Sequence, residues 1–265
     1  MYVELRRDDR LPIVAYAQWL LGQHPAVGRE SLPIDGLFGP QTERAVLLAQ
    51  QAESFPTTGR IAEPLWSALR RVVADQTICV ESIGIGSVSP RWSVNGFDPD
   101  VLADRNHLDD HDPHTAVVIQ GGASMGLPRA IDRILARPHR RCVLLRFHGH
   151  GAPGFMVVSA DGTAGSAFDL HESEGYRREL ARLRPLFGRF GSIELHGCRV
   201  ASGDRGHRSL RMLAEEARVP VTAAYQRQMG GAFSNRFEGP VRTVFPGATT
   251  LPSWARSQVD NQSAA

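Results

Sequence analysis

The chain falls into two segments that differ in the spacing of their hydrophobic residues. In the first 75 residues, apolar positions recur every three or four residues, a spacing that predicts short helices. We expect these helices over residues 13–21, 41–51 and 62–69, separated by turns rich in Gly and Pro. From about residue 77 the pattern changes to short apolar runs that alternate with helical periods, and this change predicts a domain boundary.

The second segment reads as a regular alternation of strands and helices. Apolar strands are predicted at 114–121, 142–148, 192–196 and 220–225, and helices at 127–136, around 176–187 and at 210–217. Parallel strands need such crossover helices, so we expect an α/β fold with a mainly parallel sheet covered on both faces. The predicted domains are a helical domain at 1–75, an α/β domain at 76–249 and a flexible polar tail at 250–265.

Composition excludes several classes of function. The chain has 265 residues with 30 basic and 28 acidic side chains, and this balance argues against nucleic-acid or membrane-surface partners. No run approaches ~18 consecutive apolar residues, so we expect no membrane span. The first residues lack the pattern of a secretory signal, so we expect a protein that is cytoplasmic as synthesised, with export by a non-Sec route left open. Three cysteines, an odd number, favour reduced thiols.

A glycine-rich motif stands between the first two predicted helices, with the sequence Asp35-Gly36-x-Phe38-Gly39-Pro40-x-Thr42. Asp35 can close an Asx turn, and Gly36 and Gly39 can adopt backbone angles closed to other residues. The Thr42 hydroxyl can meet free N–H groups at the start of the second helix. A stable turn and a binding loop both use such residues.

Residues 12–71 resemble the peptidoglycan-binding domain family, a three-helix module of bacterial cell-wall enzymes. The resemblance rests on this motif and on Gln18, Leu21, Ala45-Val46, Gln50, Thr58-Gly59 and Trp66-x-x-Leu69. It implies a peptidoglycan-binding role, for which Asp35, Gly36, Phe38, Gly39 and Thr42 are the motif residues. Ala49 departs from the family, which usually has an aromatic residue there, so docking of another partner stays open.

Two predicted strands end in residues that could take part in catalysis. One continues into His148-Gly149-His150-Gly151 and the next into His196-Gly197-Cys198. In an open α/β sheet the reactive residues gather beyond the carboxyl ends of the strands. A thiol near an imidazole becomes a strong nucleophile, and the imidazolium protonates the departing amine. Backbone N–H groups near Gly151, Gly197 and Cys198 can stabilise an oxyanion, so the pattern predicts a cysteine peptidase.

Residues 115–247 resemble the caspase-like superfamily of cysteine peptidases, which includes caspases, gingipains, clostripain and separase. The matching segments are Val143 to Gly151 and Ile193 to Arg199, and His150-Gly151-Ala152-Pro153-Gly154 and Gly197 to Gly203 are closer still to an uncharacterised caspase-like domain of bacterial surface proteins. The 48 residues from His150 to Cys198 agree with the roughly 50 expected in caspase-type chains. The resemblance implies that His150 is the base, that Cys198 is the nucleophile, that the substrate is a polypeptide and that no cofactor is needed.

His148 and His196 depart from the caspase-like pattern and keep two alternatives open. Together with His150 and Cys198 they form His-x-His and His-x-Cys pairs, which could hold Zn²⁺ tetrahedrally. We therefore predict a cysteine endopeptidase positioned by a peptidoglycan-binding-like module, with His148 and His196 as auxiliary residues and no metal. The alternatives are a non-catalytic cell-wall-binding or adaptor protein and a zinc-dependent wall hydrolase.

Overall fold

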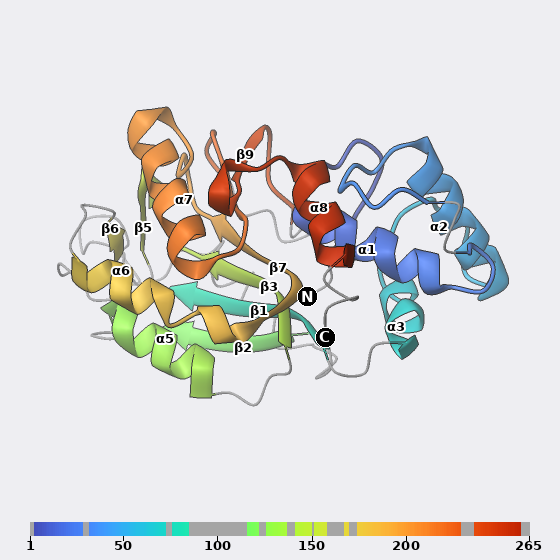
Figure 1. Cartoon of the computed structure of the whole chain (residues 1–265), viewed down its shortest axis with the longest axis horizontal. Helices are drawn as coiled ribbons and strands as arrows, with labels where there is room; N and C mark the ends of the chain where they lie inside the picture. Colours follow the sequence, from blue (N-terminus) through green and yellow to red (C-terminus); the bar gives the residue numbers. More distant parts are fainter. Residues whose placement is uncertain are drawn as a thin grey trace, which may run out of the picture. The chain divides into compact units, whose positions relative to one another are not determined.

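The chain folds into two compact units, which we call the helical unit and the α/β unit (Figure 1). The helical unit comprises Tyr2–Gln76 and Thr249–Ala265, and the α/β unit comprises Thr77–Ala248. The computed structural model describes residues 3–28, 32–72, 76–84, 116–121, 126–136, 141–149, 151–157, 167–169, 174–228 and 236–260.

The helical unit is built around a central helix that is buried on all sides. Its elements are α1 (Pro12–Gln23), α2 (Pro40–Ala52), α3 (Leu65–Leu69), the short 3-10 helix η2 (Arg70–Val72) and α8 (Leu251–Asp260). Every residue of α1 from Pro12 to Gly22 is buried, so the amphipathic stripe read from the sequence understates its burial. The Tyr16 ring lies 6.0 Å from the Trp19 ring and 6.3 Å from the Trp66 ring, so stacked aromatic rings fill this core.

The prediction of a flexible C-terminal tail is wrong for residues 251–260. They form α8, which packs against α1. Trp254 and Ala255 are buried, and the Leu251 side chain lies against Gly36, where an added Cβ would be 2.6 Å from Leu251 Cδ1. The polar residues around Trp254 led to the prediction of a tail. One large apolar side chain can nevertheless anchor an otherwise polar helix.

The α/β unit contains a six-stranded, mainly parallel sheet in the order β2-β1-β3-β7-β8-β9 (Figure 1). β1–β2, β3–β7 and β7–β8 pair in parallel, and β8–β9 is antiparallel. The strands of this sheet are β1 (Gln76–Gly84), β2 (Ala116–Gly121), β3 (Arg141–His148), β7 (Phe187–His196), β8 (Val221–Ala224) and β9 (Val241–Val244). A second, antiparallel sheet follows β3 and has the order β4 (Gly151–Ala152), β5 (Phe155–Val157) and β6 (Ala167–Asp169). The α/β class and the mainly parallel sheet are confirmed.

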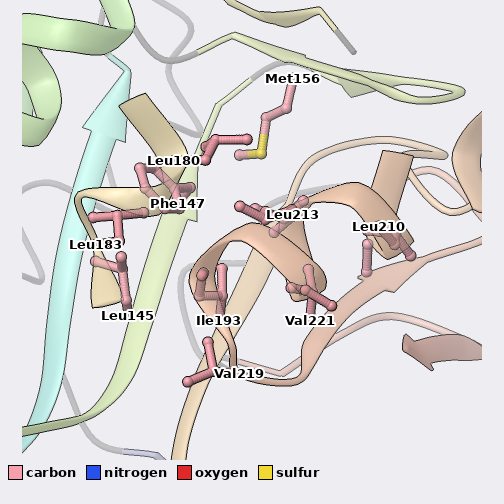
Figure 2. Close-up of a cluster of buried hydrophobic side chains, with 14 of the residues drawn as sticks. Leu145, Phe147, Met156, Leu180, Leu183, Ile193, Leu210, Leu213, Val219 and Val221 are labelled. Carbon is pink, nitrogen blue, oxygen red and sulfur yellow. The ribbon is translucent and has the colours of Figure 1, made fainter. Parts of the chain in front are cut away.

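Three longer helices of this unit contribute to one core against one face of the sheet (Figure 1). They are α5 (Gly126–Ala136), α6 (Glu174–Ala181) and α7 (Gly203–Ala217), and the short 3-10 helices are η3 (Arg184–Leu186) and η4 (Pro246–Ala248). Leu145, Phe147, Ile193 and Val221 point from the strands into this core (Figure 2). Alternate residues of β3, β7 and β8 face the other way, and it is there that the polar residues of the strands lie.

Two predicted boundaries move by several residues. Phe187, read as the end of a helix, begins β7, and α7 begins at Gly203 rather than at residue 210. Gly203 and Gly206 resemble loop residues in the sequence. Gly206 is nevertheless required inside the helix, because an added Cβ would lie 2.4 Å from the carbonyl carbon of Ala201. The start of α7 is therefore pressed against the turn that follows Cys198. No helix in the described ranges is long and apolar enough to cross a membrane.

Candidate functional site

The two strands predicted to end in His and Cys are neighbours in the sheet. β3 and β7 run parallel, and the last residue of each is paired, His148 with His196. Arg146 is likewise paired with Glu194. The sheet order turns next to this pair, between β1 and β3, because β2 lies on one side of β1 and β3 on the other. Such a switch point in an open α/β sheet is where ligands commonly bind, at the carboxyl ends of the strands.

The turns that leave these strands touch each other through their glycines. The Gly149 N–H donates to the His196 carbonyl at 3.4 Å. A Cβ added to Gly151 would lie 2.8 Å from Cys198 N, and one added to Gly197 would lie 3.1 Å from the Gly149 carbonyl oxygen. Glycine at both positions lets the two backbones approach within van der Waals distance. The structure thus places Gly151 and Gly197 together beside Cys198.

His150 lies outside the described residues, and so does the side chain of His148. The residues on each side of His150 do belong to the described part, and both lie against the Cys198 turn: Gly149 through the His196 carbonyl and Gly151 through the Cys198 backbone. The pairing of His150 with Cys198 therefore stays a prediction. This pairing requires the two turns to lie close together, and the structure shows that they do.

Cys198 lies half-buried in the turn after β7, and its sulfur is held by one residue of another loop. The Gln228 N–H donates to Cys198 Sγ, and Cys198 Sγ donates to the Gln228 carbonyl, both at 3.4 Å. The next residue, Arg199, has a φ of 58°, and its N–H donates to the Gln226 carbonyl at 2.9 Å. A left-handed φ at a residue other than Gly is uncommon and clusters at functional sites. The Cys198 turn is therefore fixed from the β8 side as well as by Gly151.

The second described thiol has a different environment. Cys142 in β3 is fully buried and donates from Sγ to the Leu144 carbonyl at 3.2 Å. Both thiols are free, as expected. Buried thiols of this kind are inert, whereas reactive ones lie in partly exposed sites, so Cys198 is the better candidate nucleophile of the two.

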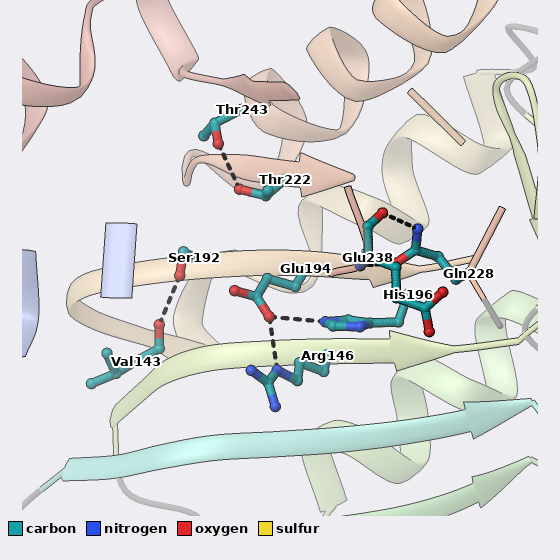
Figure 3. A network of polar contacts seen from close by, with 9 residues as sticks. All are labelled: Val143, Arg146, Ser192, Glu194, His196, Thr222, Gln228, Glu238 and Thr243. Carbon is teal, nitrogen blue, oxygen red and sulfur yellow. Dashed lines mark hydrogen bonds and ion pairs between the residues drawn. The ribbon is translucent and has the colours of Figure 1, made fainter. Parts of the chain in front are cut away.

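A buried charged network lies next to this turn on the polar face of the sheet (Figure 3). Glu194 Oε2 accepts from Arg146 Nε at 2.8 Å and lies 3.0 Å from His196 Nε2. The side chains of Arg146 and Glu194 are only 2% and 3% exposed. His196 in turn stacks on Phe237, with ring centroids 4.2 Å apart and planes inclined by 11°.

The neighbours of Glu194 keep it ionised. Burial alone would raise its pKa, but the positive charge of Arg146 and the hydrogen bonds from His196 and Arg146 outweigh burial and lower the pKa. An ionised carboxylate only accepts hydrogen bonds, so His196 Nε2 carries the proton of this contact. Glu194 therefore fixes both the tautomer and the orientation of the His196 ring.

Nothing in the described part of the chain forms a metal site. Among those residues, no group of three His, Cys, Asp or Glu side chains is placed to hold a metal ion. The zinc alternative needs the side chains of His148 and His150, which lie outside that part, so it stays a prediction. One of its four proposed ligands is His196, whose Nε2 is already hydrogen-bonded to Glu194.

The glycine-rich motif of the helical unit surrounds a buried glutamine. Gln18 Oε1 accepts from the N–H groups of Asp35 and Gly36, at 3.0 and 2.8 Å. Gln18 Nε2 donates to Asp35 Oδ1, to the Leu37 carbonyl and to Thr42 Oγ1 at 2.9 to 3.0 Å. Every hydrogen-bonding position of this amide is thus used inside the fold.

The conformation of the motif agrees with the sequence only in part. The Asx turn is present, because Asp35 Oδ1 accepts from the Leu37 N–H at 2.9 Å, and Gly36 has a φ of 77°. Gly39 has a φ of −89°, which any residue adopts, and the Thr42 hydroxyl donates to the Leu37 carbonyl instead of meeting helical N–H groups. Phe38 and Thr42 are buried. The motif builds the turn, and its largest side chains face the core.

Three residues of the site were missed by sequence analysis: Arg146, Glu194 and Gln228. Charged residues at alternate positions of a strand normally indicate a solvated face, and only pairing of β3 with β7 reveals that Arg146 and Glu194 neutralise each other. Gln228 lies in a loop without periodicity. The contact between Glu194 and His196 could have been predicted, because the two residues share one face of a strand that ends beside Cys198.

Comparison with known proteins adds no family assignment. The chain matches no model of a protein family, and a search of the curated proteins finds no match.

Proposed function

We propose that the α/β unit is a cysteine endopeptidase in which Cys198 is the nucleophile and His150 the base. The observation that carries the proposal is the contact between the two strand-end turns, in which Gly151 lies against the Cys198 backbone. His150 directly precedes Gly151 in the sequence. The parallel register of β3 and β7 supports the same arrangement.

The proposed reaction transfers an acyl group in two steps. The Cys198 sulfur attacks the carbonyl carbon of a peptide bond as His150 takes the thiol proton, and N–H groups of the turns at Gly151 and Gly197–Cys198 stabilise the oxyanion. The C–N bond then breaks, and His150 returns the proton to the departing amine. Water hydrolyses the resulting thioester and restores the thiol. All atoms come from the substrate, one water molecule and these side chains, so the proposal uses no metal or cofactor.

In this proposal the His196 unit is auxiliary. Its Nε2 is committed to Glu194, and Phe237 covers the ring, so His196 is oriented by two contacts. His196 is thus held in place at the end of β7, two residues before Cys198, and in the proposal His150 carries the proton transfer.

The helical unit is proposed to position the peptidase and to perform no chemistry. Its resemblance to peptidoglycan-binding modules favours a cell-wall location, while the burial of Phe38 and Thr42 restricts any ligand contact to other residues. Sedimentation of the protein with insoluble peptidoglycan tests this role. Recovery of the protein in the pellet supports peptidoglycan binding, and recovery in the supernatant favours docking of another partner.

The experiment for the proposed activity compares the wild-type chain with Cys198→Ala. Each is incubated with a denatured proteome digest, and new peptide N-termini are counted by mass spectrometry. The proposal expects new termini with the wild type and their loss with Cys198→Ala, while Cys142→Ser, a change at the buried thiol, serves as the matched control in any preparation that stays folded. Equal cleavage by wild type and Cys198→Ala rejects the nucleophile, and no cleavage by any variant favours the adaptor alternative. Stoichiometric zinc in the purified protein would favour the wall hydrolase.

A further inference from the structure

Two sets of hydrogen bonds join the two ends of the connection between β8 and β9: the Tyr225 N–H donates to the Pro240 carbonyl at 3.1 Å, and the Gln228 side chain pairs with Glu238. Gln228 Oε1 accepts from the Glu238 N–H, and Gln228 Nε2 donates to the Glu238 carbonyl, both at 2.9 Å (Figure 3). The same Nε2 also donates to the carbonyls of Arg227 and Gln226, at 3.1 and 3.4 Å. An amide offers a donor and an acceptor side by side, so it can pair with both polar groups of one backbone residue. A carboxylate of the same shape lacks the donor.

Both ends of this closure contact the candidate site. The Gln228 backbone exchanges two hydrogen bonds with Cys198 Sγ. On the other side, Phe237 directly precedes Glu238 and stacks on His196. The side chain of Gln228, the residue that holds the thiol, is therefore bonded to Glu238, the neighbour of the residue that covers the imidazole.

We infer that Gln228 is a positioning residue: its bidentate pairing with Glu238 holds both the Cys198 thiol and the His196 ring in place. The inference deepens the proposed function and rests on it. Without the amide, the Gln228 peptide is free to rotate away from Cys198 Sγ. Gln228 and Glu238 are then no longer joined, only the Tyr225–Pro240 bond still links the ends of the connection, and Phe237 is no longer held on the His196 ring. The two groups of the site are released together.

The test measures the thiol and the imidazole separately in one variant. Iodoacetamide alkylation of Cys198, read by peptide mass spectrometry, reports the thiol, and the ring-proton NMR signals of His196 report its stacking on Phe237. In Gln228→Ala we expect Cys198 to react about fivefold faster, the factor for loss of one ordinary hydrogen bond. We also expect the His196 signals to move, because the aromatic ring above them departs.

Arg227→Ala is the matched control, since Arg227 is an exposed residue of the same loop and accepts from the Gln228 side chain through its backbone carbonyl, which the substitution keeps. It should leave both readings unchanged. If Gln228→Ala leaves both readings at the wild-type values, or moves only one of them, a single side chain does not hold both groups and the inference is wrong. If Arg227→Ala moves both readings as much as Gln228→Ala, any change in this loop releases the two groups and the inference is wrong.

Two further measurements keep the test decisive if Gln228→Ala does not fold. Gln228→Glu preserves the shape but removes the donors, and it should change both readings in the same direction as Gln228→Ala. In the wild-type protein the Glu238 amide proton should exchange with solvent at least about tenfold more slowly than an unprotected amide. Exchange at the unprotected rate overturns the inference. None of these readings needs a substrate, so absence of peptide cleavage would reject the proposed function without touching the Gln228 result.

Discussion

At the scale of single residues, burial decides which polar groups define the site. Arg146 and Glu194 were not singled out in the sequence, and the structure buries both and joins them to the largely buried His196 side chain in one network. Arg146 and Glu194 are 48 residues apart along the chain, so no local pattern could pair them. The place of Cys198 in the turn after a strand, in contrast, could be predicted, because the glycine beside it and the strand before it are local features.

Glu194→Gln tests the energetic role of this network. The substitution leaves the buried Arg146 charge without its counter-ion, and breaking a buried pair from one side costs about 3–5 kcal/mol. We expect that loss in the free energy of unfolding, measured with denaturant. Replacing both Arg146 and Glu194 by Leu removes both charges and should cost much less. A double variant as unstable as Glu194→Gln would mean that the network stabilises the fold by something other than charge pairing.

The same residue makes stability depend on pH. The pKa of Glu194 is lowered in the folded state, so its contribution is complete above the ordinary Glu pKa of about 4.3 and is lost as pH falls through the folded value. The difference in unfolding free energy between wild type and Glu194→Gln should therefore narrow below about pH 4.3. Titration of both proteins by chemical denaturation from pH 7 downward checks this, and a constant difference would contradict it.

Gly151 is the residue at which the two turns meet. An added methyl group would lie 2.7 Å from Val200 Cγ2 and 2.8 Å from Cys198 N, so Gly151→Ala must push the turns apart, at a cost of about 1–3 kcal/mol. Gly39→Ala is the control, because nothing lies within 4 Å of its added Cβ and its φ is ordinary. We expect it to cost no more than about 1 kcal/mol, as a change at a helix N-cap. Equal costs in equilibrium unfolding would show that the turns are not in close contact.

At the scale of helices and strands, periodicity predicted the type of most elements but not their limits. The helices of the first segment and the alternating strands of the second are present at the expected places. The predicted starts of β7 and α7 were too late in the chain. Phe187 fits the apolar stripe of a helix, and Gly203 and Gly206 resemble loop residues. β9 and the small sheet of β4 to β6 were missed. Their strands are four residues or shorter, too short for a period to be recognised.

In α8 one buried side chain anchors an otherwise polar segment to the helical unit. Trp254 is buried in the helical unit, and truncating a buried Trp costs about 3–5 kcal/mol. Trp254→Ala should therefore destabilise the helical unit by that amount and raise amide exchange in α1. Arg256→Ala, an exposed change on the same helix, should stay within about 0.5 kcal/mol of wild type. If Trp254→Ala leaves α1 exchange unchanged, α8 does not belong to this unit.

At the scale of the whole molecule, the helical unit is discontinuous in sequence. Residues on both sides of the α/β unit, 2–76 and 249–265, fold together, so the chain leaves the helical unit and returns to it. A linear reading of the sequence assigns the last residues to a tail because a return of this kind has no local signature. The α/β class itself could be predicted, since it depends on the alternation of elements along the chain.

The central claim is that Cys198 is activated by His150, and the pH dependence of thiol alkylation tests it most directly. Comparison with Cys142 is not sufficient, because that thiol is fully buried and reacts slowly for that reason alone. The rate of Cys198 alkylation by iodoacetamide should be measured from pH 5 to 10 in wild type, His150→Ala and, as the control, exposed His207→Ala. We predict that His150→Ala alone slows alkylation at neutral pH by about tenfold or more and moves its midpoint to higher pH, because a neighbouring imidazolium favours the thiolate. Superimposable profiles for all three proteins would contradict the account.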